Sequence, residues 1–140
     1  MAKVVIDANV IISAAFGGKP LEAVVRALKD HAVYLSDTIE RELHGVISRL
    51  SKKLSNDQIL FLREKIQQLL SLAKHISIST HVALSRDAKD DHYLSLCKEA
   101  KVDFLVTGDR DLLSISQDKL RANGIPCKVV SPQEFLESLS

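Results

Sequence analysis

Short apolar runs alternate with longer amphipathic segments along the whole chain. Five short runs have the length and composition of buried strands: Lys3–Asp7, Ala32–Ser36, His75–Ser79, Asp103–Thr107 and Cys127–Ser131. Between the runs, apolar residues recur at spacings of three and four, which indicates helices with one buried face. This alternation predicts an α/β domain, with a mostly parallel sheet of about five strands covered by helices on both faces.

Capping patterns predict where several helices begin. Asp37 and Glu40 have the spacing of an N-cap and the third residue of a helix, and we assign Asp37 wholly to capping. The stretch DHYLSLCKEA also reads as a helix, with Tyr93, Leu94 and Cys97 on one face. Two further capping patterns are Ser55 with Gln58, and Ser131 with Pro132 and Glu134.

The length of 140 residues fits one domain, which we take as residues 1–140. Hydrophobic residues make up 46% of the chain but aromatic ones only 4%, so the core must be aliphatic. Nineteen basic and eighteen acidic residues leave a net charge of +1, so nucleic-acid binding would require a local basic patch. No apolar run approaches the roughly 20 residues that span a membrane. We expect a soluble, cytoplasmic protein.

The cysteines and histidines show no metal-binding pattern. Cys97 and Cys127 are isolated in the sequence, and we interpret them as small buried hydrophobes in a reducing compartment. The five histidines, His92 among them, are scattered without ligand spacing, and we interpret them as surface or packing residues. A zinc site is therefore not expected.

Acidic residues stand where two of the predicted strands end. The first strand ends at Asp7, and the fourth is followed by Gly108 and Asp109. In a doubly wound sheet these two strand tips are neighbours, and binding sites form at the carboxyl ends of the strands. We therefore expect Asp7 and Asp109 to face each other.

Further acidic residues are expected near Asp7 and Asp109. Glu42 lies between Ile39 and Val46 by helical spacing, so it borders the apolar stripe of its helix. Asp90 and Asp91 begin the helix before the fourth strand, and Asp111 follows Asp109. Each acid alone also fits a helix cap or a first-turn residue.

Several carboxylates at one sheet edge repel each other, unless their pKa values rise or a cation neutralises them. Oxygen ligands without His or Cys favour Mg²⁺ or Mn²⁺. Such an ion polarises a phosphate oxygen and lowers the pKa of a bound water. The pattern therefore predicts hydrolysis of a phosphate ester.

At these residues the sequence resembles the PIN domain family of metal-dependent ribonucleases. The similar stretches are VVIDANVIISA, SDTIERELHGVI and RDAKDDHYLSLCKEAKVDFLVTGDRDLL. The resemblance implies a three-layer α/β/α sandwich that is Rossmann-like, with Mg²⁺- or Mn²⁺-dependent endonuclease activity on RNA. It also implies homodimers or higher homo-oligomers. Within the family, the chain looks most like small prokaryotic toxins, which implies an antitoxin protein as a partner.

The resemblance assigns roles to individual residues. The expected catalytic acids are Asp7, Glu42, Asp90 or Asp91, and Asp109. All of them except Glu42 are expected metal ligands, while Glu42 orients or deprotonates the attacking water. Helical phase favours Asp90 as the third acid, whereas the spacing to Thr107 in shorter family members favours Asp91.

Other residues are expected to support the acids. Asn9 and Thr107 would fix the carboxylate rotamers, with Asp111 close by. The flanking cations Arg86, Lys89 and Arg110 are the expected contacts to RNA phosphates.

Two alternatives stay open. The stretch GDRD also resembles the Asp-x-Asp of a Toprim-type phosphoryl-transfer site, although that site expects a glutamate where this chain has Asp7. The other alternative is a non-catalytic PIN-like module that binds RNA or protein.

Overall fold

Five parallel strands form one sheet at the centre of the protein, in the order β3-β2-β1-β4-β5. The strands are β1 (Lys3–Ile6), β2 (Ala32–Leu35), β3 (Lys74–His75), β4 (Phe104–Val106) and β5 (Lys128–Val130). The structure is a computed structural model that describes residues 1–79, 81–85 and 87–139. The predicted α/β class and parallel sheet are confirmed, and so is the predicted pairing of the first and fourth strands.

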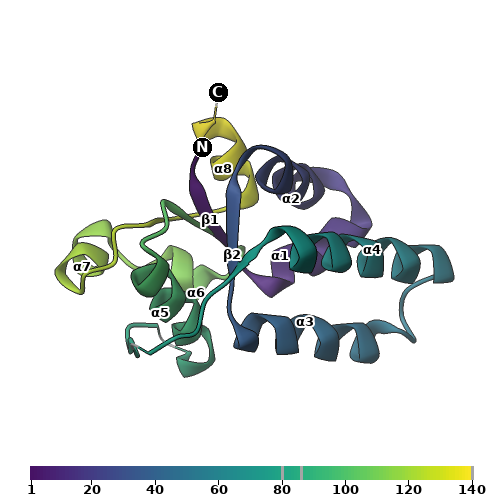
Figure 1. Cartoon of the computed structure of the whole chain (residues 1–140), viewed down its shortest axis with the longest axis horizontal. Coiled ribbons are helices and arrows are strands. Elements are labelled where there is room, and N and C mark those ends of the chain that lie inside the picture. Colours follow the sequence, from purple (N-terminus) through teal and green to yellow (C-terminus); the bar gives the residue numbers. More distant parts are fainter. Residues whose placement is uncertain (80, 86, 140) are drawn as a thin grey trace.

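Helices surround this sheet. They are α1 (Ala8–Ser13), α2 (Gly18–Asp30), α3 (Asp37–Leu50), α4 (Asn56–Leu72), α5 (Asp91–Ala100), α6 (Arg110–Leu113), α7 (Gln117–Ala122) and α8 (Pro132–Ser138), with 3-10 turns η1 (Ala14–Phe16) and η2 (Ala88–Asp90). Figure 1 shows α5 and α6 on one side of β1 and β2, α2 and α4 on the other, and α3 with α4 as a projecting hairpin. Within the described part of the chain, no helix is long and apolar enough to cross a membrane.

The core is mostly aliphatic, as the composition predicts, although the aromatic residues Tyr34, Tyr93 and Phe135 are also buried in it. Val4, Val5 and Ile6 of the central strand β1 are at most 1% exposed. Their consecutive burial follows from the helices that cover both faces of a parallel sheet, which leave no strand position facing water. This burial fixes β1 rigidly, and therefore fixes the residues that follow it at the sheet edge.

The third strand is much shorter than predicted. Only Lys74 and His75 pair with β2, and residues 76–79 lie outside any strand. Ile76 donates one more backbone hydrogen bond to Leu35 (2.8 Å), after which the chain leaves the sheet. β3 is an edge strand and both of its residues are exposed. Burial on two faces of the sheet therefore does not stabilise a longer strand at this position.

The helix caps agree with the sequence at two of three positions. Capping boxes begin α4 at Ser55 and α8 at Ser131, as predicted. The predicted cap Asp37 is wrong by one residue. Ser36 is the N-cap of α3, and its hydroxyl accepts a hydrogen bond from the Ile39 N–H (3.3 Å), while Asp37 is the first residue inside the helix.

The two cysteines are buried and free, but they are not isolated in space. A hydrogen bond with Cys97 lowers the pKa of the Cys127 thiol. Burial, followed by the interaction with Cys127, raises the pKa of Cys97. The interpretation of both as buried core residues is confirmed, but their spacing in the sequence does not indicate that Cys127, directly before β5, contacts Cys97 of α5.

Candidate active site

Asp7 and Thr107 meet because β1 and β4 are paired in register. Ile6 lies opposite Val106, so the residue after each strand comes to the same edge of the sheet. The Thr107 hydroxyl donates to Asp7 Oδ2 (2.7 Å), and the Asn9 N–H donates to Asp7 Oδ1 (3.0 Å). Asp7 is 1% exposed, and both of its carboxylate oxygens are held in place. Asn9 therefore contributes its main chain, while the residue itself is exposed.

Thr107 also connects Asp7 to the next acid along the chain. Its hydroxyl oxygen accepts a hydrogen bond from the Asp109 N–H (3.0 Å). The Asp109 side chain in turn caps α6 by accepting from the Asp111 N–H (2.8 Å). One buried hydroxyl thus orients both the carboxylate after β1 and the backbone that carries Asp109.

Three carboxylates form a group at this edge. Asp90, Asp109 and Asp111 each place one oxygen so that all three oxygens lie within 4.8 Å of one another. All three residues are partly buried. Asp90 Oδ2 is a buried atom that has no hydrogen-bond partner among the described residues. Such a group, with an unsatisfied anionic oxygen, fits a hard divalent cation such as Mg²⁺ or Mn²⁺.

The electrostatic cost of this group appears at Asp90. Burial, and next hydrogen bonding between the protonated carboxyl and the Asp109 carboxylate, raise the pKa of Asp90 to about 7, with further contributions from the charges of Asp109, Asp7 and Asp87. A carboxylic acid with this pKa holds its proton near neutral pH unless a positive charge replaces the proton. The metal-free site therefore binds either a proton or a cation.

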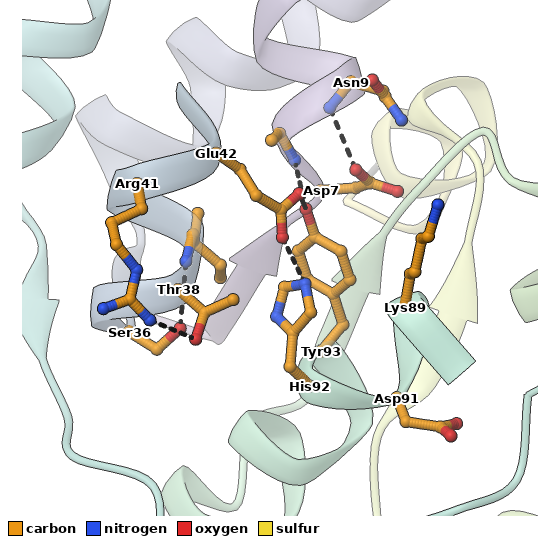
Figure 2. A network of polar contacts seen from close by, with 12 residues as sticks. Asp7, Asn9, Ser36, Thr38, Arg41, Glu42, Lys89, Asp91, His92 and Tyr93 are labelled. Carbon is orange, nitrogen blue, oxygen red and sulfur yellow. Dashed lines mark hydrogen bonds and ion pairs between the residues drawn. The ribbon is translucent and has the colours of Figure 1, made fainter. Parts of the chain in front are cut away.

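Asp91 has a different environment from Asp90. Its Oδ1 accepts hydrogen bonds from the backbone N–H groups of Leu84 (3.1 Å) and Ser85 (2.7 Å). Figure 2 shows its side chain directed away from Asp7 and Glu42. Of the two alternatives for the third acid, the structure thus brings Asp90 into the carboxylate group and uses Asp91 to hold the preceding loop.

Glu42 reaches the site from α3 and is held by two residues of α5. The Tyr93 hydroxyl donates to Glu42 Oε2 (3.1 Å) and accepts from the Ala8 N–H (3.0 Å). Burial and the charges of Asp7 and Glu42 raise the pKa of Tyr93, so its hydroxyl stays protonated as a donor. His92 forms an ion pair with Glu42 through Nε2, as Figure 2 shows.

Sequence reasoning missed His92 and Tyr93 as parts of this site. We interpreted His92 as a surface or packing residue, yet its side chain is 17% exposed and contacts Glu42. The signal available was its position directly after the acidic pair, on the same helix. Tyr93 was assigned to the buried face of that helix, which is correct, but its hydroxyl extends past the core to the sheet edge.

Two of the three expected phosphate contacts, Lys89 and Arg110, adjoin the acids Asp90 and Asp109 in the chain. Lys89 in η2 and Arg110 at the start of α6 are both exposed. In Figure 2 the Lys89 side chain extends in the direction of Asp7. Arg86, the third expected contact, lies outside the described residues.

The fold and the site together define a class. Carboxylates gather at the carboxyl ends of adjacent parallel strands, and the close group of three contains neither His nor Cys. This donor set is typical of proteins that use Mg²⁺ or Mn²⁺ on phosphate-containing ligands.

Comparison with known proteins identifies the family. The PIN domain profile matches residues 3–111, and the chain belongs to this family. A search of curated proteins found no match. Among solved structures, the chain is similar to VapBC2 from Rickettsia felis bound to a DNA fragment from its promoter, with a TM-score of 0.55 and 14% identity over 92% of this chain and 98% of that one. It is also similar to PAE2754 from Pyrobaculum aerophilum, with a TM-score of 0.59 and 14% identity over 99% of this chain and 89% of that one.

Proposed function

We propose that the protein is an Mg²⁺- or Mn²⁺-dependent endoribonuclease that hydrolyses RNA phosphodiester bonds. The observation that carries the proposal is the group formed by Asp90, Asp109 and Asp111, in which a buried carboxylate oxygen has no partner among the described residues. Membership of the PIN domain family supports the same reaction. A purely structural acid would be expected to satisfy its buried oxygens with backbone donors, as Asp91 does with its Oδ1.

Each acid then has a distinct task. Asp90, Asp109 and Asp111 would hold the cation, so Asp111 takes a ligand position that the sequence analysis gives to Asp7. Asp7, fixed by Thr107 and Asn9, lies outside this group of three and would complete the negative edge. When bound, the ion supplies charge to a phosphate oxygen and lowers the pKa of a coordinated water.

Glu42 is the residue that can take the proton from the attacking water. It is a carboxylate with 38% of its side chain exposed, so substrate and solvent can reach it. His92 and Tyr93 fix its orientation from one side. The expected products, as the family implies, carry 5′-phosphate and 3′-hydroxyl ends. Lys89 and Arg110, with Arg86, would contact the RNA phosphates on either side.

We also propose that the protein acts as the toxin of a toxin–antitoxin pair. Support comes from the similarity of the chain to VapBC2, whose structure was determined on promoter DNA. Exposed Leu60 and Leu72 on α4 offer apolar surface for a homodimer or for an antitoxin. Expression of the wild type should arrest growth of the host cells, whereas expression of Asp109→Asn should not. The molecular mass of the purified protein in solution tests whether it is a dimer.

The central experiment is cleavage of a mixed, end-labelled RNA pool with Mg²⁺, Mn²⁺ or EDTA, using the wild type and Asp109→Asn. Cleavage that requires the metal and is lost in the variant supports the proposal. Titration calorimetry with Mn²⁺ accompanies the assay. A wild type that binds no Mn²⁺ and cuts no RNA would overturn the proposal, whereas Mn²⁺ binding without cleavage of any RNA would favour a non-catalytic binding module.

A further inference from the structure

A cavity of about 280 Å³ lies beside the candidate active site, at the end of β2. It is enclosed by the start of α3, by the segment that follows β3 and by α5. Its lining includes Thr38, Arg41, Ile76, Ile78, His81 and His92. This volume lies just below the roughly 300–1,000 Å³ typical of small-molecule sites, so the cavity suits a small planar group rather than a large ligand.

The cavity and the acid site share a wall. His92 lines the cavity and at the same time forms the ion pair with Glu42. Arg41, the residue before Glu42 on α3, also lines it. Figure 2 shows Arg41 and Thr38 on one side of His92, and Asp7 on the other. A ligand in the cavity would therefore be separated from the candidate active site by little more than the Glu42–His92 pair.

The lining has the chemistry that holds a nucleobase. Ile76 and Ile78 supply apolar surface, and Arg41 and His81 supply a planar guanidinium and an imidazole, both on exposed residues. Bases of single-stranded RNA stack on histidine rings and arginine planes. Thr38 contributes a hydroxyl for the polar edge of a base.

The same lining does not select a phosphate, because the carboxylate of Asp37 opposes the guanidinium of Arg41. Asp37 is one of the lining residues, and its carboxylate would repel a phosphate while attracting the amino group of a base. Nε2 of His92 is already engaged with Glu42. An uncharged base therefore fits this mixed lining better than a phosphate does, and the phosphate is left to the acid site and its flanking cations.

A second hollow, of about 450 Å³ on the Asp109 side, lacks this chemistry. Its described lining has no cation and no aromatic ring, and includes Val10, Pro20 and Pro132. Stacking groups are thus concentrated on the Glu42 side of the site.

We propose that the cavity lined by Arg41, His81 and the two isoleucines binds the base of the ribonucleotide next to the cleaved phosphate. This proposal rests on the proposed function, since it names a base-binding subsite of the same nuclease. Recognition of one unpaired base explains how a small site with few cations holds a single RNA strand so that one phosphate lies at the acids. It also implies that double-stranded RNA, whose bases are paired and stacked, is a poor substrate.

The first test needs no catalysis. Adenosine, guanosine, cytidine and uridine, which carry no phosphate, are titrated into the metal-free protein while backbone amide shifts are followed by NMR. We expect saturable shifts at Thr38, Ser77 and Ile78 for at least one nucleoside. Ser77→Phe, which adds a ring at an exposed position that lines the cavity, should weaken this binding by about tenfold or more, because the ring fills space that the base would occupy in a cavity of about 280 Å³. Equal binding by wild type and variant would overturn the proposal.

The second test uses cleavage kinetics. Arg41→Ala should raise KM for single-stranded RNA about tenfold, with kcat and Mn²⁺ affinity unchanged. Arg49→Ala is the matched control, since it removes an exposed arginine from the last turn of the same helix, and it should leave KM unchanged. A wild type that cleaves RNA but binds no nucleoside would overturn the base site and leave the nuclease standing. Nucleoside binding that Ser77→Phe removes, in a protein that cleaves nothing, would support the base site and count against the nuclease.

Discussion

At the scale of single residues, Asp90 and Asp91 show that adjacent identical side chains can have unrelated roles. Asp90 ends η2 and joins Asp109 and Asp111, whereas Asp91 begins α5 and accepts two backbone N–H groups from the preceding loop. The difference arises because consecutive residues at a helix start point about 100° apart. Asp90 is therefore left with a buried oxygen that has no partner among the described residues, whereas Oδ1 of Asp91 accepts two backbone N–H groups.

Asn substitutions at these two positions should separate metal binding from stability. Asp90→Asn should lower Mn²⁺ affinity by more than about tenfold and RNA cleavage by about 100-fold or more, since it removes a charge from the three-carboxylate group. Asp91→Asn should change cleavage by less than about threefold but lower the free energy of unfolding by about 1–2 kcal/mol, since its hydrogen bonds to the loop lose their charge. Calorimetry measures the Mn²⁺ affinity, cleavage assays measure the activity, and urea unfolding measures the free energy of unfolding. The reverse pattern would identify Asp91 as the metal ligand.

Removal of one hydroxyl tests how Glu42 is positioned. Tyr93→Phe removes the donor to Glu42 and leaves the Ala8 N–H without its partner. We expect kcat to fall about tenfold with little change in KM or Mn²⁺ affinity, and the free energy of unfolding to fall by about 1–3 kcal/mol. Tyr34→Phe, at a buried tyrosine of β2 remote from the acid group, is the control and should leave kcat unchanged. An unchanged kcat in Tyr93→Phe would limit Tyr93 to a structural role.

At the scale of elements, the start of α3 decides where Glu42 is placed. Ser36 ends β2 and caps α3, so the strand and the helix that carries Glu42 are joined without a loop. The sequence pattern of Asp37 with Glu40 competes with this cap, and it places the helix start one residue too late. The short connection explains the outcome, because a cap at Ser36 satisfies the Ile39 N–H directly after the strand.

Two alanine substitutions distinguish the cap from its neighbour. Ser36→Ala should lower the free energy of unfolding by about 1 kcal/mol, because it leaves an N–H at the helix start unpaired. Asp37→Ala should cost only about 0.3–1 kcal/mol, the contribution of an exposed first-turn acid to the helix dipole. Chemical unfolding of both variants measures the difference. A larger cost at Asp37 than at Ser36 would restore the cap that the sequence predicts.

The sequence predicts those elements whose pattern is long enough to show a period. Helices α3, α4 and α5 have ten or more residues with one buried face, and their positions follow from that spacing. Helices α1, α6 and α7 have only four to six residues, which is less than two turns, so no period can indicate them. The edge strand β3 was predicted too long, since apolar alternation at 75–79 reflects packing outside the sheet.

The sequence predicts those parts of the candidate site that strand order brings together. It does not predict the parts that depend on the direction in which a side chain points. Asp7 and Thr107 follow paired strands, so topology alone brings them to one edge. The choice between Asp90 and Asp91 depends on a 3-10 turn before α5, which the sequence does not show. His92 and Tyr93 reach Glu42 across two helices, and this kind of contact leaves no spacing signature.

At the scale of the whole molecule, the two parts of the site come from opposite ends of the chain. The Thr107–Asp7 hydrogen bond joins residues 100 positions apart, and Lys3 donates its backbone N–H to Asp103 (2.8 Å) at the other end of the same strand pair. The carboxylates therefore come together only in the folded protein. Their repulsion is a cost of folding, and any cation they bind is coupled to global stability.

This coupling predicts how stability depends on pH. The pKa of Asp90 is about 7 in the folded protein and 3.8 in a free carboxyl. Between these values the folded state keeps a proton that the unfolded state has lost, so the stability of the metal-free protein should fall as pH rises from about 4 to 7. The Tm of the wild type, compared with that of Asp90→Asn in EDTA, should show this trend, because the titrating groups that do not interact with Asp90 contribute equally to both proteins.

Mn²⁺ should reverse the trend, because the cation binds the ionised carboxylate and takes the place of the proton. At a fixed Mn²⁺ concentration, the rise in Tm should be small at pH 5.5 and larger at pH 8 for the wild type, and small at both pH values for Asp90→Asn. Differential scanning fluorimetry over this pH range gives both curves. Wild-type and variant curves that run parallel, with and without Mn²⁺, would mean that Asp90 carries no perturbed charge. In that case the three carboxylates would be ordinary surface acids. Only a carboxylate that is repelled by its neighbours is stabilised when a cation neutralises that repulsion.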